Sequence, residues 1–317
     1  MDEGGQPVIK VKTKRKPKEY LIDRARDRQT QFLLSNGAVR GTWVQANLVL
    51  EEMALNHELG PFETLILGQA YVAALLMAST LKGEDRFNLS ISVDGPVKGF
   101  SVDANAFCAV RGYLLENPIR IPTDWKDVEL PKVLGSGTLT LTRFLERKTA
   151  PMSGTVEYLP NSLAESLAYY YQQSEQTPSA FVLSLPFDRE GNLLGGGGLM
   201  LQAMPGSSVE EWDHLLLRLR TLPSVGENAA ESHEPSALLD FWFSDLHPQV
   251  MESRRVEFFC ECSKQKFSKV LTTLPAEDRT EILSKGPFPM ETTCHHCNSA
   301  YWFERAELEA IWSKLSD

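Results

Sequence analysis

Cysteine is scarce in this chain of 317 residues, and its five cysteines are unevenly placed. Cys108 stands alone, whereas the other four fall in the last fifth of the sequence. A chain with so few cysteines is not a small disulfide-stabilised scaffold. The first 20 residues also lack the apolar run of a secretory signal. We therefore expect a cytoplasmic protein, in which closely spaced thiols serve metal binding or redox chemistry rather than structural disulfides.

Long apolar runs and an excess of positive charge are missing as well. The most apolar stretch, 65–81, is interrupted by Gly68, Gln69 and Ser79, which predicts a buried helix rather than a membrane span. The chain has 32 Lys and Arg against 42 Asp and Glu, a net charge of −10. A surface of that sign repels phosphate backbones and anionic lipids, so we expect neither a nucleic acid nor a membrane as a partner.

The composition is otherwise that of an ordinary folded protein. Hydrophobic residues make up 42% of the chain, enough for a core, and the length suits two domains. Alternating apolar and polar residues predict several strands, separated by a few helices. The clearest predicted strands are 38–44, 87–93, 100–104, 138–142, 155–158, 181–185 and 199–203. We therefore expect an α+β fold, with an N-terminal sheet-and-helix domain, a helical linker and a small C-terminal module.

Two further segments are distinctive. Gly195–Gly198 stand between two predicted strands, and no Lys-Ser or Lys-Thr follows them, so we expect a hairpin loop rather than a phosphate-binding loop. Serine and glutamate pairs in 207–211 predict capping boxes at the start of a helix. The polar stretch 224–236 behind that helix is typical of a linker or hinge.

The strongest signal is a pair of short cysteine motifs. Cys260-Glu-Cys262 is separated by 31 residues from Cys294-His-His-Cys297. Four thiolates brought together in this way suit a tetrahedral Zn²⁺ ion, with Zn–S distances of ~2.3 Å. We therefore predict one Zn²⁺ per chain, bound by these four cysteines in the reduced state.

The residues around the second motif fit such a site. Asn298 follows it directly and can adopt the left-handed backbone conformation that a metal-binding turn requires. His295 and His296 lie between two complete cysteine pairs, so we expect them not to be ligands. Cys108 has apolar neighbours and is expected to be a small buried side chain.

The metal should matter for folding. The segment from Val256 to the end has only 62 residues, a size at which apolar burial alone gives marginal stability. Zinc binding is worth on the order of 10–16 kcal/mol in small modules, so its loss should unfold this one. Each cysteine has a partner two or three positions away, and oxidation can close a local disulfide within each pair and expel the metal. The spacing alone does not decide between such a switch and a purely structural site.

Three other functions compete with a switch. A nucleic-acid-binding zinc ribbon would need a basic stripe, but residues 256–317 contain seven Lys or Arg against ten Asp or Glu. A thiol–disulfide oxidoreductase could use Cys294 and Cys297, but it calls for one exposed, reactive thiol on a thioredoxin-like unit. No hydrolase motif is evident in the N-terminal domain, and we expect a protein that is not an enzyme.

Taken together, these residues resemble the redox-regulated heat-shock chaperonin of 33 kDa, the HslO family. The resemblance runs from about Tyr20 to Trp312, and its most specific part is the cysteine pattern. The motifs that support it elsewhere are Val39-Arg40-Gly41, Asp94-Gly95-Pro96, Leu134-Gly135-Ser136-Gly137-Thr138-Leu139 and Gly197-Gly198-Leu199-Met200-Leu201-Gln202. The chain departs from the family in its basic extension and in Asn298, where glycine is usual.

The resemblance implies an ATP-independent holdase that is inactive while reduced and zinc-bound. It implies that Cys260–Cys262 and Cys294–Cys297 disulfides form under oxidative stress, that zinc leaves, and that the C-terminal module and linker unfold. The active form, a homodimer in the family, then keeps unfolding proteins from aggregating. The apolar residues that we expect to cover the sheet domain at rest and to bind clients once released are Trp212, Leu216, Phe241, Trp242 and Phe243.

The predicted organisation therefore has four parts. They are a flexible basic extension (1–19), an N-terminal α+β chaperone core domain (20–206), a helical linker or hinge region (207–255) and a C-terminal zinc-binding redox-switch domain (256–317).

Overall fold

The structure, a computed structural model, describes residues 26–121, 125–160, 162–231 and 234–313. The basic extension predicted at 1–19 lies outside these residues. The chain forms two compact units and passes from the larger to the smaller between Phe259 and Cys260.

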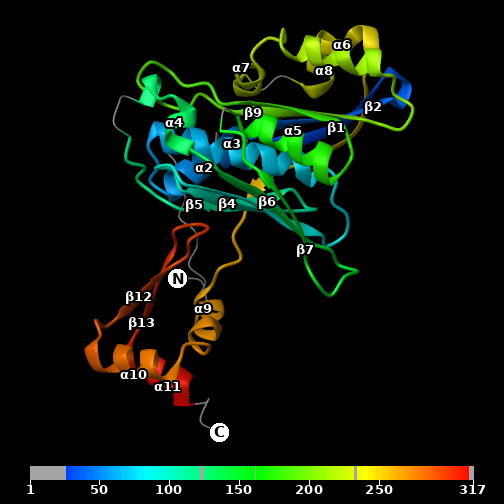
Figure 1. Cartoon of the computed structure of the whole chain (residues 1–317). Helices are drawn as coiled ribbons and strands as arrows, with labels where there is room; N and C mark the ends of the chain where they lie inside the picture. Colours follow the sequence, from blue (N-terminus) through cyan, green and yellow to red (C-terminus); the bar gives the residue numbers. More distant parts are fainter. Residues whose placement is uncertain (1–25, 122–124, 161, 232–233, 314–317) are drawn as a thin grey trace. The chain divides into compact units, whose positions relative to one another are not determined.

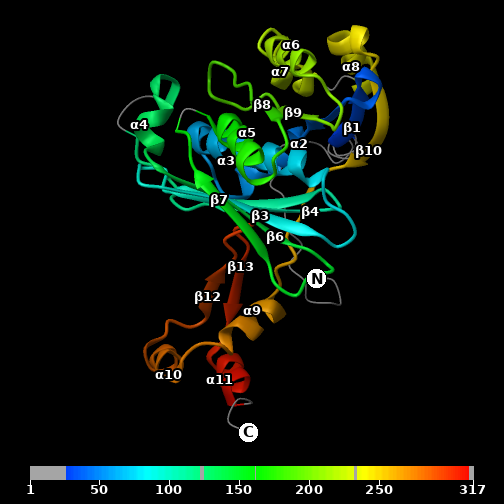
Figure 2. The same cartoon turned by 45° about the vertical axis from the view of Figure 1, so that its right-hand side comes forward.

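The larger unit contains two sheets, visible in Figures 1 and 2. The first has the strand order β10 (Gln249–Arg255), β1 (Arg28–Leu34), β2 (Val39–Gln45), β9 (Gly197–Ala203), β8 (Ser179–Ser184). The second has the order β11 (Glu257–Phe258), β5 (Ala109–Leu114), β4 (Gly99–Asn105), β3 (Arg86–Val93), β6 (Gly137–Phe144), β7 (Met152–Glu157). Neighbouring strands are antiparallel, except that β11 pairs with β5 in parallel. The mixed fold and the predicted strands are confirmed.

The helices of the larger unit lie between and outside these sheets. They are α2 (Asn47–Asn56), α3 (Pro61–Ala78), α4 (Leu130–Leu134), α5 (Leu163–Ser174), α6 (Val209–Leu219), α7 (Val225–Ala230) and α8 (Pro235–Phe243). Ser162 begins α5 by accepting a hydrogen bond from the Glu165 amide, and Ser208 and Glu211 form a complete capping box on α6. Local sequence thus sets where these helices begin.

The central helix α3 explains the apolar stretch seen in the sequence. It begins with Pro61 at its first position and packs against strands of both sheets, including β9 of the first and β4 and β5 of the second (Figure 1). By length and composition it could cross a membrane, but 83% of its apolar window is buried inside the protein. The buried helix predicted at 65–81 is therefore confirmed, although it begins and ends earlier.

A buried carboxylate fixes the start of α2. Asp27 is 1% exposed, and its Oδ2 accepts hydrogen bonds from the amides of Leu48 and Val49, at 2.8 and 3.0 Å. Its backbone carbonyl accepts a hydrogen bond from the Val256 amide, just before β11. Desolvation by burial raises the pKa of Asp27 to about 7, against the opposing effect of the backbone hydrogen bonds.

The helices α6, α7 and α8 cover the outer face of the first sheet (Figures 1 and 2). Trp242 of α8 meets Trp43 of β2 edge to face, with ring centroids 5.2 Å apart, and Phe243 stacks on Phe32 of β1 at 6.2 Å. The buried cluster between sheet and helices consists of Phe32, Leu34, Val39, Trp43, Leu199, Leu201, Leu215, Val225, Ala229, Leu238, Leu239, Trp242 and Phe243. The polar stretch 224–236 is therefore not simply a linker, because it contains α7, and Val225 and Ala229 of that helix are core residues.

The glycine run has a different role from the predicted one. Gly197 and Gly198 do not belong to a loop but to β9, where they pair with Gln45 and Val44 of β2. A β-carbon on Gly197 would lie 2.8 Å from the β-carbon of Ala229 in α7, too close for any side chain. The glycines therefore allow α7 to approach the sheet. The hairpin itself is confirmed, because β8 and β9 are antiparallel neighbours.

The smaller unit is a hairpin with three helices. Its elements are β12 (Met290–Thr293), β13 (Ala300–Phe303), α9 (Lys264–Leu271), α10 (Ala276–Lys285) and α11 (Arg305–Ser313). The Trp312 indole N–H donates a hydrogen bond to the Leu271 carbonyl at 2.9 Å and so joins α11 to α9. The described buried apolar side chains, other than cysteine, are few: Leu271, Tyr301, Phe303, Leu308 and Trp312.

Candidate metal centre

Four cysteine sulfurs meet in the smaller unit. Cys260 and Cys262 precede α9, and Cys294 and Cys297 lie in the turn between β12 and β13. All four Sγ atoms lie within 4.8 Å of one another, with 3.7 Å between Cys260 and Cys294 and 3.2 Å between Cys262 and Cys297. None of the four forms a disulfide. The structure thus brings together the whole predicted ligand set.

Local backbone geometry directs the sulfurs to one point. In the hairpin turn, the Cys294 carbonyl accepts hydrogen bonds from the amides of Cys297 and Asn298, at 3.3 and 2.7 Å. Asn298 has a φ of 55°, so the predicted left-handed conformation is confirmed. On the other side, the Ser263 hydroxyl accepts a hydrogen bond from the Lys266 amide and begins α9 directly after Cys262.

The sulfur geometry fits a single tetrahedral ion. Zn–S bonds of ~2.3 Å imply sulfur–sulfur separations of ~3.8 Å; the Cys260–Cys294 separation of 3.7 Å matches this value, and the Cys262–Cys297 separation of 3.2 Å is shorter. Hydrogen bonds from Cys262 and Cys294 lower the pKa of Cys260, whereas hydrogen bonding to Cys260 raises the pKa of Cys294. The cluster therefore loses its first proton easily and the later ones only when a cation offsets their charge.

Two hydroxyl groups contact the cluster from β13 and from the turn. The Tyr301 Oη lies 3.0 Å from the Cys262 Sγ, and the Ser299 Oγ lies 3.2 Å from the Cys297 Sγ. Cys262 is partly exposed, whereas the other three cysteines are 3–6% exposed. Among the described residues no histidine joins the four sulfurs, and the predicted non-ligand role of His295 and His296 stays a prediction.

Sequence reasoning did not identify Tyr301 and Ser299 as part of this site. Tyr301 was visible only as an aromatic residue shortly after the second motif. The available signal is its spacing, because a residue four positions after Cys297 on a hairpin can return to the cluster.

The five residues predicted to bind clients lie in different environments. Trp242 and Phe243 are 4% and 0% exposed and face the first sheet, and Trp212 packs against the same cluster. Leu216 is half-buried on α6, whereas Phe241 is 71% exposed. Their role in client binding stays a prediction.

The sheet face beneath α8 was not identified from the sequence. Phe32, Trp43, Leu199 and Leu201 form it and are at most 1% exposed. A signal was present in β9, since an uninterrupted apolar run such as Leu199–Leu201 is typical of a strand covered on both faces.

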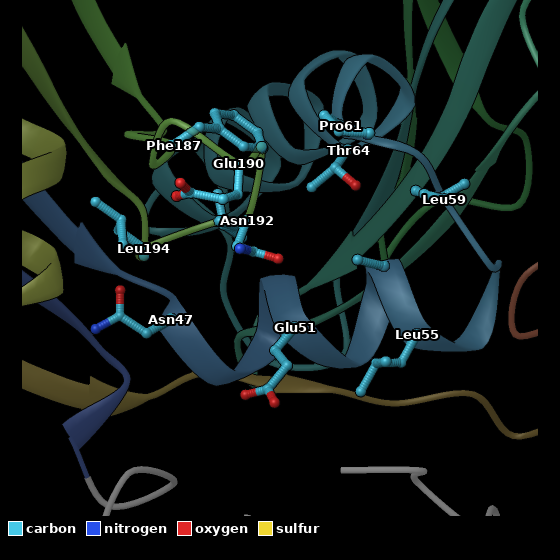
Figure 3. A pocket seen from close by; sticks show the side chains of 14 residues that line it. Asn47, Glu51, Leu55, Leu59, Pro61, Thr64, Phe187, Glu190, Asn192 and Leu194 are labelled. Carbon is cyan, nitrogen blue, oxygen red and sulfur yellow. The ribbon is translucent and has the colours of Figure 1, made fainter. Parts of the chain in front are cut away.

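The larger unit also has a cavity of about 440 Å³, shown in Figure 3. It lies between α2, the start of α3 and the connection from β8 to β9. Its polar lining includes Asn47, Glu51, Thr64, Glu190 and Asn192. Among its 14 lining residues there is no serine, cysteine or histidine.

Fold and site together define a class of protein: an α+β unit, with helices laid over one sheet, followed by a small unit built around four cysteines. Known proteins have this organisation. The sequence model described as Hsp33 protein matches residues 27–304, which include all four clustered cysteines. The chain belongs to the Hsp33 family.

Individual relatives agree. The 33 kDa chaperonin of Desulforamulus reducens is 31% identical over 292 residues, covering 92% of this chain and 99% of the relative. That of Lactiplantibacillus plantarum is 32% identical over 292 residues, covering 91% and 98%. The crystal structure of the 33 kDa chaperonin from Thermotoga maritima matches with a TM-score of 0.82 and 26% identity, covering 92% of this chain and all of that chain.

Proposed function

We propose that this chain is a redox-regulated, ATP-independent holdase that binds unfolding proteins under oxidative stress. The observation that carries the proposal is the convergence of four cysteine sulfurs, none of them in a disulfide, in a unit whose described residues include few other buried side chains. Membership of a chaperone family supports the class of activity.

In the resting state, Cys260, Cys262, Cys294 and Cys297 would hold one Zn²⁺. Bound zinc would supply the cross-link between the hairpin turn and the segment before α9, and hence most of the folding energy of the smaller unit. Four thiolates with no open position are the donor set of structural rather than catalytic zinc.

Oxidation removes these ligands. Within each pair, two thiolates give two electrons to one hydrogen peroxide molecule and form a disulfide, and the peroxide leaves as two hydroxide ions. The pairs Cys260–Cys262 and Cys294–Cys297 are the local ones along the chain. Once both have formed, no thiolate remains to bind zinc, and the smaller unit loses its main source of stability.

The client surface would come from the helices α6, α7 and α8 and the face of the first sheet beneath them; these three helices are called the cover below. Trp242 and Phe243 on α8, together with Trp43 beneath them, are apolar and buried at rest. The indole N–H groups of Trp43 and Trp242 are buried without a hydrogen-bond partner in the described structure. The desolvation free energy that these two groups lose when the helices pack on the sheet is therefore not regained in new hydrogen bonds. Such an interface is suited to opening.

We further propose a cytoplasmic location and a homodimeric active form.

A redox titration of the full chain tests the proposal. The reduced protein is expected to contain about one zinc per chain and to leave the heat aggregation of citrate synthase unchanged. Hydrogen peroxide should release the zinc, measured with a chromogenic chelator, and suppress the light scattering of aggregating citrate synthase.

The matched control is Cys108→Ala, which removes the one cysteine outside the cluster. Cys108 is fully buried, and desolvation raises its thiol pKa to about 11, so it should not take part. This variant should behave as the wild type. Zinc that stays bound through oxidation, or equal activity in both redox states, would contradict the proposal.

A further inference from the structure

The environment of Cys262 differs from that of the other three sulfurs. Cys262 is the partly exposed cysteine of the cluster, so an oxidant from solvent reaches it most easily. It is also the cysteine whose sulfur lies 3.0 Å from the Tyr301 hydroxyl. The sulfur that is easiest to reach is thus the one with a phenol beside it.

The position of Tyr301 is set by the fold and not by the sulfur. Tyr301 is 4% exposed and pairs with Thr292 across the β12–β13 hairpin. Its ring packs on Phe267 of α9, with ring centroids 5.0 Å apart. The hydroxyl is therefore held in place before any change in the redox state of Cys262.

A hydroxyl in this position lowers the reactivity of a thiolate. An O–H group that donates to sulfur stabilises the negative charge and occupies a lone pair, and a charge-assisted hydrogen bond is stronger than a neutral one. Attack on peroxide uses that electron density, so the donor must be lost or weakened before the sulfur can react. Groups next to metal ligands commonly alter affinity or reactivity by factors of ~10 to 100.

We propose that Tyr301 is a positioning residue that slows the oxidation of Cys262 and thereby sets the oxidant threshold of the C-x-C pair. This inference rests on the proposed redox function. In the step concerned, the Cys262 thiolate attacks one peroxide oxygen, the O–O bond breaks, and sulfenic acid and hydroxide form. The Cys260 thiolate then displaces hydroxide from that sulfenic acid and closes the disulfide.

The second pair provides an internal comparison. The Cys297 thiol donates a hydrogen bond to the Ser299 hydroxyl at 3.2 Å, and once Cys297 is a thiolate this hydroxyl is placed to donate to it, as Tyr301 is placed to donate to Cys262. Its contact is longer and Cys297 is 3% exposed, so the effect of removing it should be smaller. Each hydroxyl should control its own pair.

The test uses the full zinc-loaded chain with Tyr301→Phe, which deletes one oxygen and keeps the ring on Phe267. On addition of hydrogen peroxide, mass spectrometry should show the Cys260–Cys262 disulfide forming about tenfold faster than in the wild type. The Cys294–Cys297 disulfide should form at the wild-type rate. Ser299→Ala is the matched control, expected to accelerate only Cys294–Cys297.

A second measurement checks that the variant keeps its zinc, since reduced Tyr301→Phe should contain as much zinc as the wild type. In this zinc-loaded reduced protein, iodoacetamide should alkylate Cys262 faster in Tyr301→Phe than in the wild type, while Cys297 is unchanged. Equal rates for Cys262, or an equal acceleration of both pairs, would overturn the role of Tyr301. Wild-type protein that keeps its zinc under peroxide would instead contradict the proposed function, so the two failures are distinguishable.

Discussion

The two units of this chain are stabilised in different ways. Of the twelve largest fully buried side chains among the described residues, only Phe303 belongs to the smaller unit, whereas the larger unit has buried apolar side chains along α3 and a buried cluster beneath α8. Helix α10 has no buried residue, and α9 buries only Leu271. The larger unit is thus stabilised by apolar burial, whereas the smaller unit has little of it. Under the proposed function, loss of a metal bound by the four cysteines would unfold the smaller unit and leave the strands of the larger unit folded.

The strongest test of this comparison removes one ligand. Cys294→Ser should lower zinc affinity and unfold the smaller unit, because metal binding contributes on the order of 10–16 kcal/mol to modules of this kind. Hydrogen exchange measured by mass spectrometry should show loss of protection in 264–313 and unchanged protection in the strands of the larger unit. Wild-type zinc content together with an intact smaller unit would refute the ligand role of Cys294.

The next test acts on the cover of the larger unit. Trp242→Ala deletes the ring that packs on Trp43, and we expect a loss of about 3–5 kcal/mol in the stability of the larger unit. Zinc content should not change. Urea unfolding measures the loss, and an apolar fluorescent dye should bind the reduced variant more strongly than the wild type.

Phe241→Ala is the matched control, because Phe241 is the neighbouring aromatic residue and is 71% exposed. Its effect should stay within about 0.5 kcal/mol. Similar losses for both variants would mean that α8 is not anchored by its buried face.

A pH-dependent test concerns Asp27 in the larger unit. Its folded pKa of about 7 lies above the ordinary aspartate value of 3.8, so its contribution favours the folded state below pH 3.8 and is lost as the pH rises through 7. Asp27→Asn keeps an oxygen for the amides of Leu48 and Val49 but does not titrate. Between pH 5 and about 7, the unfolding free energy of the variant should rise relative to the wild type by about 1 kcal/mol per pH unit. Urea unfolding of both proteins at several pH values measures this, and a constant difference would contradict it.

The smallest effect is expected at the surface of the cover. Arg218 of α6 and Asp245, after α8, form a two-point ion pair with contacts of 2.5 and 2.7 Å, and both side chains are partly exposed. The Arg218 hydrogen bonds lower the pKa of Asp245. A double-mutant cycle with Arg218→Ala and Asp245→Ala should give a coupling below about 1 kcal/mol, decreasing with salt. A larger coupling would show that charge, and not only apolar contact, holds the cover in place.

The parts of the molecule that the sequence predicts well are those that depend on neighbouring residues. The predicted strands follow from alternation, the start of α6 follows from its capping box at Ser208, and the cluster of four cysteines follows from two short motifs. Asn298 was predictable because few residue types adopt a positive φ.

What could not be predicted depends on pairings between distant segments. The β1–β10 pair joins Arg28 to Arg255, and no local pattern indicates that partner. Gly197 and Gly198 were assigned to the loop instead of to β9; the close approach of Ala229 to Gly197 is a packing requirement visible only in three dimensions. The Tyr301 contact with Cys262 likewise joins residues 39 positions apart.

The glycines of β9 have a consequence for the order in which the cover opens. At α7 the contact combines the buried side chain of Val225 with close approaches of Ala229 and Ala230 to the backbone at Gly197 and at Gly195, which precedes the strand. At α8 it consists of interlocked indole and phenyl rings. Because aromatic rings bury more surface than methyl groups, we expect the attraction of each side chain to the sheet to be larger at α8 than at α7. Detachment from the sheet should therefore begin at α7 and reach α8 last. A mild perturbation would release α7 alone, and only a strong one would expose the aromatic side chains beneath α8.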